Sequence, residues 1–151
     1  MSANPREQFV DDISAYFSAV GFPRMAARVF AHLLGTDQET LTARDLADQI
    51  GVSPAAISGA VRYLGQVALI RRTRSPGERK DRFGLGTNVW ESAMTAEQAA
   101  FPPLITMCEQ ALSDVDFAAG PRARIEEARD FMRFMQAEMP LLMEKWRAQR
   151  G

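Results

Sequence analysis

The chain has 151 residues, with 46% hydrophobic and 25% charged side chains, which is the balance of a folded protein and excludes a disordered or fibrous chain. One cysteine, Cys108, excludes an internal disulfide framework, and one histidine, His32, leaves few ligands for a metal site. No apolar run approaches the ~20 residues of a membrane span, and the N-terminal segment lacks the apolar core of a secretory signal. We therefore expect a cytoplasmic protein without cofactors and without membrane contact.

The net charge of −1 is unevenly distributed along the chain. Between residues 62 and 82, seven basic residues stand against two acidic ones, so this segment carries +5 and the rest of the chain −6. A basic segment in an acidic chain indicates a localised anionic partner. A solvated basic loop would have the same composition, so the charge alone leaves both interpretations open.

The first 35 residues predict two helices. Asn4 is an expected N-cap with Pro5 at the first helical position, and apolar residues recur at helical spacing until Gly21. Pro23 opens a second helix that ends at Gly35, and a polar connector follows. We expect segment 1–35 to support the fold and to contribute to dimerisation.

Segment 36–86 predicts two short helices and a hairpin. Thr42 and Asp45 have the spacing of a capping box for a helix that ends at Gly51, and Ser53 caps the next helix, whose inner face carries Ile57, Val61 and Leu64. After Gly65, residues 67–74 predict a strand, 75–77 a turn and 82–85 a returning strand.

Segment 87–151 predicts helices. Thr95 is a candidate start of a helix that reaches about Leu112 and is interrupted by prolines 102 and 103. Pro121 opens a last helix to about Gln149, which would be ~40 Å long. Its stripe of methionine and aromatic residues is larger than a small domain can cover, so we expect these helices to form a dimer.

The central segment has the spacing of a helix-turn-helix. Ala47 is small where two helices would cross, and Gly51 supplies the positive φ of the sharp turn. The second helix has short exposed side chains, which suit entry into a major groove about 12 Å wide. A basic hairpin follows directly, so the predicted fold is mainly α with a small β-hairpin: a winged helix-turn-helix flanked by dimerisation helices.

The expected contacts with double-stranded DNA come from the second helix and from the basic hairpin. Ser53 can donate to a phosphate, Arg62 can reach a base edge, and Arg79 can enter a narrow minor groove. Gly59 costs roughly 1 kcal/mol inside a helix, which a close approach to another backbone would explain. The candidate residues are Ser53, Ala55, Ala56, Ser58, Gly59, Arg62, Arg74, Arg79, Lys80 and Arg82.

Residues 46–64, the Leu-Ile-Arg-Arg segment after them and the Gly-Glu-Arg-Lys-Asp hairpin resemble a MarR-type regulator. The segment from Gly77 to Lys80 and the last helix with Pro140 and Trp146 are most similar to the GbsR-like branch. The resemblance implies a homodimeric transcription factor with helix 54–65 in the major groove and wing 75–81 in the minor groove. It also implies control of DNA binding by a small-molecule effector, whose identity the residues do not indicate.

The dimer is expected to form through apolar residues of the first and last helices. These are Phe9, Ile13, Phe17, Phe131, Phe134, Met135, Leu142 and Trp146. A two-fold dimer predicts a pseudo-palindromic operator.

We therefore expect a ligand-responsive repressor that associates with the nucleoid when it binds DNA. The alternative is a winged-helix protein–protein interaction module without DNA binding. An enzyme is not expected, because the sequence lacks a phosphate loop, a nucleophile elbow and a metal-ligand cluster.

Overall fold

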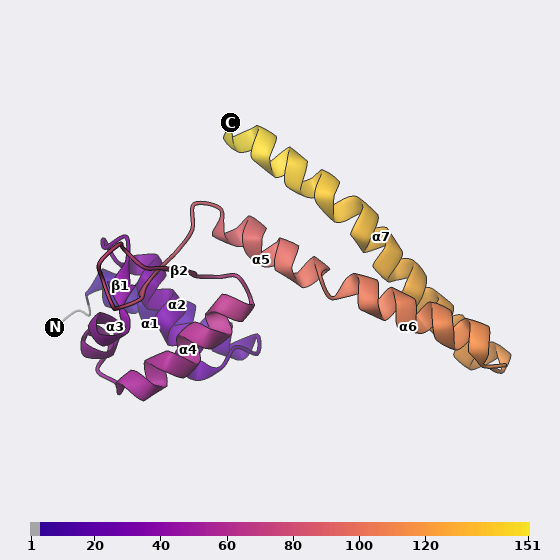
Figure 1. Ribbon diagram of the computed structural model, residues 1–151, viewed down its shortest axis with the longest axis horizontal. Helices are drawn as coiled ribbons and strands as arrows, with labels where there is room; N and C mark the ends of the chain where they lie inside the picture. The colour runs from indigo at the N-terminus through magenta and orange to yellow at the C-terminus, as the bar shows by residue number, and fades with distance from the viewer. Residues whose placement is uncertain (1–3) are drawn as a thin grey trace. The chain divides into compact units, whose positions relative to one another are not determined.

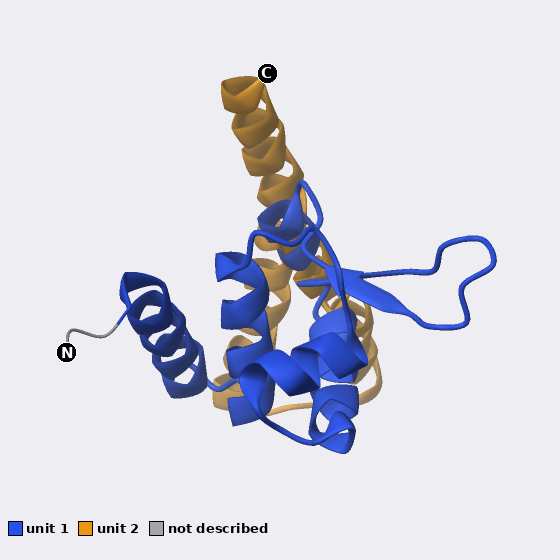
Figure 2. Ribbon diagram, turned by 90° about the vertical axis from the view of Figure 1, so that its left-hand side faces the viewer, with its two compact units in different colours: residues 1–93 blue, residues 94–151 orange. Residues whose placement is uncertain are grey.

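The structure is a computed structural model that describes residues 4–151. The chain divides into two compact units, Met1–Ala93 and Met94–Gly151 (Figure 2). Helix α5 (Val89–Gln98) begins in the first unit and ends in the second. The three segments expected from the sequence divide the chain by role rather than by packing, and that division stays a prediction.

The first unit contains four helices before α5: α1 (Pro5–Ala19), α2 (Arg24–Gly35), α3 (Ala43–Ile50) and α4 (Pro54–Gln66) (Figure 1). The expected caps are confirmed. Asn4 accepts from the backbone of Arg6, and Thr42 and Asp45 form both hydrogen bonds of a capping box. Because each cap satisfies backbone N–H groups that a helix start leaves unpaired, these side chains define where the helices begin.

The core of this unit is built from α2, α3 and α4. Phe30, Leu46, Ile57 and Leu64 are completely buried, one or two from each of the three helices. Ala47 is also buried, and Gly51 ends α3 at φ 78°, so the predicted crossing and turn of the helix-turn-helix are confirmed.

Three short strands form an antiparallel sheet in the order β1-β3-β2. Strand β1 (Leu41–Thr42), which the sequence did not indicate, pairs with β3 (Arg82–Gly84), and β3 pairs with β2 (Arg71–Thr73). A side chain at Gly84 could not be accommodated, because a Cβ there would lie 2.3 Å from the Glu39 carbonyl oxygen.

The strand expected from residue 67 begins only at Arg71, so that prediction was wrong by four residues. Helix α4 continues through Gly65 and closes in a Schellman motif, in which Leu69 N donates to Leu64 O at 3.0 Å and Ala68 N to Gly65 O at 3.2 Å. Ala68 takes the left-handed position at φ 58°. Buried Leu69 contacts the same core as Leu64, which explains why an apolar run typical of a strand forms a helix end instead.

The second unit contains the end of α5, then α6 (Phe101–Asp114) and α7 (Ala119–Arg150), which pack side by side (Figure 1). The helix start expected at Thr95 was wrong, because α5 already begins at Val89 and has Thr95 in its interior. The interruption at the prolines is confirmed, since Pro102 and Pro103 lie in the first turn of α6, where missing N–H groups are tolerated.

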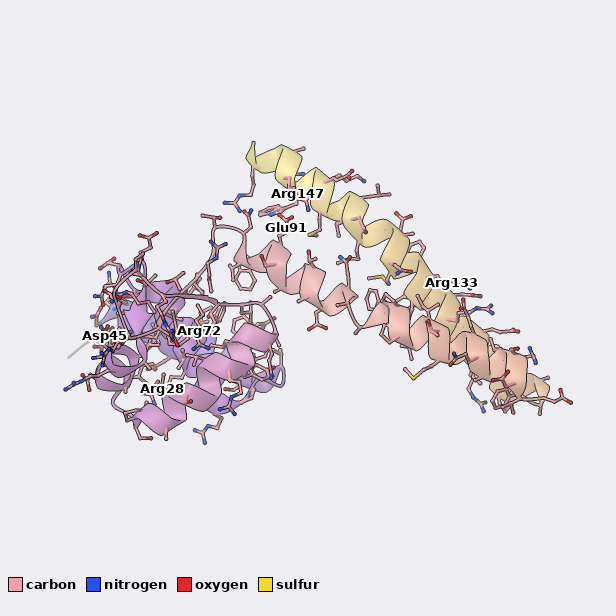
Figure 3. The ribbon with its side chains drawn as sticks, viewed as in Figure 1. Arg28, Asp45, Arg72, Glu91, Arg133 and Arg147 are labelled. Carbon is pink, nitrogen blue, oxygen red and sulfur yellow. The ribbon has the colours of Figure 1, made fainter. Side chains whose placement is uncertain are left out.

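Helix α7 has 32 residues with Pro140 inside it and is therefore about 48 Å long. Its residue Arg133, labelled in Figure 3, forms an ion pair with Glu109 of α6. Ile105 and Met139 are the buried side chains of this unit. Along residues 4–151, no helix combines the length and the apolar character that crossing a membrane requires.

Candidate nucleic-acid interface

Helix α4 presents a face of short side chains. Ser53 caps the helix by accepting from Ala56 N at 3.2 Å, and Pro54 occupies its first position. Because Ile57, Ala60 and Leu64 point into the core, the opposite face is left to solvent. The exposed members of that face are Ser53, Ala55, Ser58, Gly59 and Arg62, and Ala56 is half-buried.

Gly59 lies in the middle of this face and is not required by the packing of the protein. A Cβ at Gly59 would meet no atom of the chain within 4 Å, and the residue does not have a positive φ. A helical glycine costs roughly 1 kcal/mol relative to alanine, and the packing of the chain gives no reason for that cost. The close approach to DNA expected of Gly59 stays a prediction.

The segment between β2 and β3 projects from the helices of the first unit and forms the wing (Figure 2). Its turn has the expected form, with Glu78 N donating to Ser75 O at 3.0 Å and Gly77 at φ 85°. Arg79 and Lys80 follow the turn and are exposed. Over the described range 4–151, neither side chain forms a hydrogen bond or an ion pair, so both are available to an anion.

Two arginines of the wing have a partner within the protein. Asp81 accepts from Arg74 Nε at 2.9 Å and also pairs with Arg72, which is labelled in Figure 3. The Arg72 guanidinium, followed by that of Arg74, holds the pKa of the Asp81 carboxyl below its usual range. Asp81 therefore fixes the positions of two neighbouring arginines.

Arg82 is half-buried, whereas the other candidate cations are exposed, and its hydrogen bonds reach outside the wing. Its Nε donates to Thr40 Oγ1 at 2.9 Å and its Nη2 to the Thr40 carbonyl at 3.2 Å. These bonds join the base of the wing to the loop before β1. A role for Arg82 in DNA contact stays a prediction, and its visible role is to anchor the wing.

A hollow of about 690 Å³ lies between the start of α3, helix α4 and the base of the wing. Val61, Ile70 and Phe83 contribute apolar surface to it. Four cations from separate elements also line it: Arg44, Arg62, Arg72 and Lys80. Cations from α3, α4, β2 and the wing thus line one hollow, together with the Asp81 carboxylate.

Arg44 is a residue that the sequence analysis missed. It lies on α3, outside the basic segment 62–82, and only folding brings it beside Arg62. Its guanidinium is exposed, and the closest carboxylate oxygen, on Asp48, is 4.0 Å away. The sequence signal that could have identified Arg44 was a basic residue in the first turn of α3, the first helix of the helix-turn-helix.

Two family models match successive parts of the chain. Residues 20–81 match a model described as MarR family, and residues 88–149 match one described as an MmpR5-like MarR family transcriptional regulator. The chain belongs to the MarR family. It is accordingly a DNA-binding winged-helix transcriptional regulator, and this class of protein is not an enzyme.

Known proteins similar to this MarR-family chain include the HTH-type transcriptional regulator MmpR5 of Mycobacterium tuberculosis, which is 28% identical over 130 residues, covering 85% of this chain and 79% of that protein. A crystal structure of a transcriptional regulator aligns with a TM-score of 0.86 and 24% identity over 96% of this chain and 99% of that one. That likeness shows the same fold. Staphylococcus aureus MepR, a transcription regulator of the multidrug efflux pump MepA, aligns over 87% of this chain and 90% of its own at 14% identity, with a TM-score of only 0.43.

The residues expected to dimerise this MarR-family chain differ in their exposure. On α7, Phe131, Phe134, Leu142 and Trp146 are exposed and Met135 is half-buried. On α1, Phe9 is exposed and Ile13 half-buried.

Phe17 of α1 is engaged within its own protomer. Its ring lies 4.9 Å from that of Phe22 and 5.0 Å from that of Phe30, measured between centroids. The ring of Trp90 stacks at 6.4 Å. The aromatic residue expected at the dimer contact thus belongs to the packing of the first unit.

Proposed function

We propose that the protein is a homodimeric repressor that binds a pseudo-palindromic operator and responds to a small molecule. The observation that carries the DNA-binding half is the continuous basic surface from Arg62 on α4 to Lys80 on the wing. Helix α4 would lie in the major groove, where short side chains permit close approach, and the wing would lie in the adjacent minor groove. The protein would act in the cytoplasm, on the nucleoid.

The proposal of a homodimer rests on the exposed apolar residues of α7. Phe131 and Phe134 are 55% and 60% exposed, and Leu142 is 53% exposed. Large apolar residues gathered on one helix indicate an interaction surface. A second copy of the chain would cover them, and its two-fold symmetry would place two α4 helices on two half-sites about one helical turn apart.

The branch within the family is part of the proposal. The wing and the last helix support a GbsR-like regulator, whereas the second half of the chain matches an MmpR5-like model. Both assignments lie within the MarR family. Repression rather than activation is proposed because an operator occupied in both grooves would block access to the same DNA.

The experiment that tests the function is DNA binding as a function of salt. A fluorescent fragment from upstream of the protein's own gene is titrated with the full-length chain, with random DNA of equal length as control. Six or more phosphate contacts predict a loss of affinity of about 10³-fold or more between 50 and 200 mM salt. Specific binding with that dependence supports the proposal, and absence of binding to both DNAs at low salt would favour a protein-interaction module.

A further inference from the structure

A second hollow in the first unit lies outside the proposed DNA interface and has a volume of about 470 Å³. Residues of α1, of α2, of the loop after α2 and of the end of α3 line it, and it is open to solvent on one side. Its volume is in the range of small-molecule sites, which hold a few hundred to about 1,000 Å³. Its polar lining includes Glu7, Asp11, Arg28, His32, Asp37, Gln38 and Gln49.

Charged groups of both signs line this hollow without neutralising one another. Glu7 and Asp11 lie one turn apart on α1. Arg28, labelled in Figure 3, lies on α2. In the part of the chain that the structure describes, none of these three side chains forms a hydrogen bond or an ion pair. Two carboxylates at i and i+4 repel each other, so a cationic group between them would be stabilised, and Arg28 would stabilise an anionic group of the same ligand.

A chain of hydrogen bonds connects the wall of the hollow to the loop after α2. His32 Nε2 lies 2.7 Å from Gln49 Oε1, and Gln49 Nε2 donates to Gln38 Oε1 at 2.9 Å. Because the Gln49 oxygen can only accept, the His32 nitrogen is the donor. The same loop is tied to α1, since Arg6 Nη2 lies 2.9 Å from Asp37.

The loop continues directly to the base of the wing. Thr40 accepts two hydrogen bonds from Arg82 of β3, and the backbone of Glu39 packs against Gly84. A ligand that displaced Asp37 or Gln38 would therefore act on a segment that contacts the wing. All these contacts lie within the first unit.

We propose that this hollow binds a small zwitterion that carries an ammonium group and a carboxylate, and that its occupancy changes DNA affinity through loop 36–40. The ammonium would lie between Glu7 and Asp11, and the carboxylate would face Arg28. The regulatory half of this inference rests on the proposed function, whereas the binding half does not require DNA.

Binding can be followed by NMR at a single imidazole ring, because His32 is the only histidine in the sequence. The imidazole resonances are recorded while glycine or 5-aminopentanoate is added, with pentylamine and pentanoate as probes that carry only one of the two charges. A zwitterion should shift the resonances saturably with a Kd of about 1 mM or tighter, worth about −4 kcal/mol. Equal binding of a singly charged probe, or no saturable shift with either zwitterion, would overturn the site.

The location is tested with variants of α1 in which carboxylates are replaced by amides. Glu7→Gln combined with Asp11→Asn should weaken the zwitterion at least about tenfold. Asp12→Asn is the control, because Asp12 is exposed and lies outside the hollow; among residues 4–151 its side chain accepts from Gln8 Nε2 alone, at 2.8 Å. Equal weakening by the control would show that the probe responds to charge on α1 in general and would overturn the assignment.

The coupling is tested by measuring DNA affinity with and without saturating zwitterion. Occupancy should change the affinity at least about fivefold, within the range of ordinary allosteric couplings. Thr40→Val removes the Oγ1 acceptor and should reduce the effect of the zwitterion on DNA affinity. It should leave the zwitterion-induced shift of the His32 resonances unchanged. Zwitterion binding with unchanged DNA affinity would overturn the regulation, and absence of DNA binding altogether would overturn the proposed function while the site itself stood.

Discussion

The guanidinium of Arg74 lies across the base of the wing from Asp81, and its Nε donates to Asp81 Oδ1 at 2.9 Å. Arg72 pairs with the other carboxylate oxygen. One acid thus holds two cations of the proposed DNA-binding surface in place and neutralises part of their charge. Because these arginines lower the pKa of Asp81, the carboxylate is ionised and the arrangement persists throughout the neutral pH range.

Asp81→Asn should raise affinity for random DNA and make its salt dependence steeper. Without the carboxylate, Arg72 and Arg74 are free to approach phosphates, and the net charge of the wing becomes one unit more positive. The ratio of specific to non-specific affinity should fall, because the two side chains no longer have fixed positions. Binding to operator and random DNA at several salt concentrations measures both effects.

Glu78→Gln is the matched control, since it removes the same charge from the same wing. The Glu78 side chain is exposed and forms no hydrogen bond or ion pair among residues 4–151. An equal change in both variants would mean that net charge alone is responsible and that the Asp81 contacts do not organise the wing.

Gly59→Ala should stabilise the folded protein and weaken its binding to the operator. The added methyl group meets no atom of the chain, and alanine favours a helix by roughly 0.5–1 kcal/mol over glycine. On DNA, the same group occupies space that α4 needs in the groove. Thermal unfolding measures the change in stability, and operator titration of the same preparation measures the change in affinity.

Gly84→Ala is the contrasting variant, because its Cβ would collide with the Glu39 carbonyl oxygen. It should lower the melting temperature. Unchanged operator affinity of Gly59→Ala would show that the glycine does not serve DNA contact.

Arg79→Ala and Arg44→Ala should each reduce the magnitude of the slope of log K against log salt by about 0.9, the change expected when one phosphate contact is lost. Both losses should be similar on operator and random DNA, because a phosphate contact carries no sequence information. Arg24→Ala, an exposed arginine at the start of α2, is the control and should leave the slope unchanged. An unchanged slope for Arg44→Ala would remove α3 from the interface.

Thr42→Ala should destabilise the protein by about 0.5–2 kcal/mol, the usual cost of losing an N-cap. The pKa of Asp45 is lowered, first by the backbone N–H of Thr42 and then by its side chain. A carboxyl whose pKa is lowered by folding stabilises the protein at pH values above 3.8, its ordinary pKa. This stabilisation is lost as the pH falls below 3.8 and through the lower pKa of the folded state. Stability should therefore fall on acidification through this range.

Urea unfolding of the wild type, Asp45→Ala and Asp48→Asn at neutral and acidic pH checks the capping box. Asp45→Ala should show a weaker loss of stability on acidification than the wild type. Asp48→Asn removes an exposed carboxylate of the same helix and should retain the wild-type loss. The opposite ranking of the two variants would contradict the capping explanation.

Phe134→Glu should convert the protein to a monomer and abolish operator binding at concentrations where the wild type saturates. The side chain is 60% exposed on α7, and a charge there opposes burial by a second copy. Gln136→Glu adds the same charge two residues away, at an exposed polar position, and should remain dimeric. Sedimentation velocity distinguishes the two, and a dimeric Phe134→Glu variant would exclude this face from the dimer.

The starts of α1, α3 and α4, and the turn of the helix-turn-helix, were predictable from short stretches of sequence. Asn4, Thr42 with Asp45, and Ser53 each satisfy backbone groups two or three residues away, and Gly51 provides a positive φ within its own turn. Such interactions depend only on neighbours in the chain. The helix-turn-helix followed from them, and the basic composition of segment 62–82 indicated an anionic partner.

The anchoring of the wing and the composition of the basic surface depended on tertiary structure. Arg82 and Thr40 are 42 residues apart, and Arg44 joins the surface only because α3 packs against α4. Ala68 takes a conformation usual for glycine because burial of Leu69 in the core compensates for it. These outcomes depend on which distant residues share a core, and a local pattern of side chains contains no information about that.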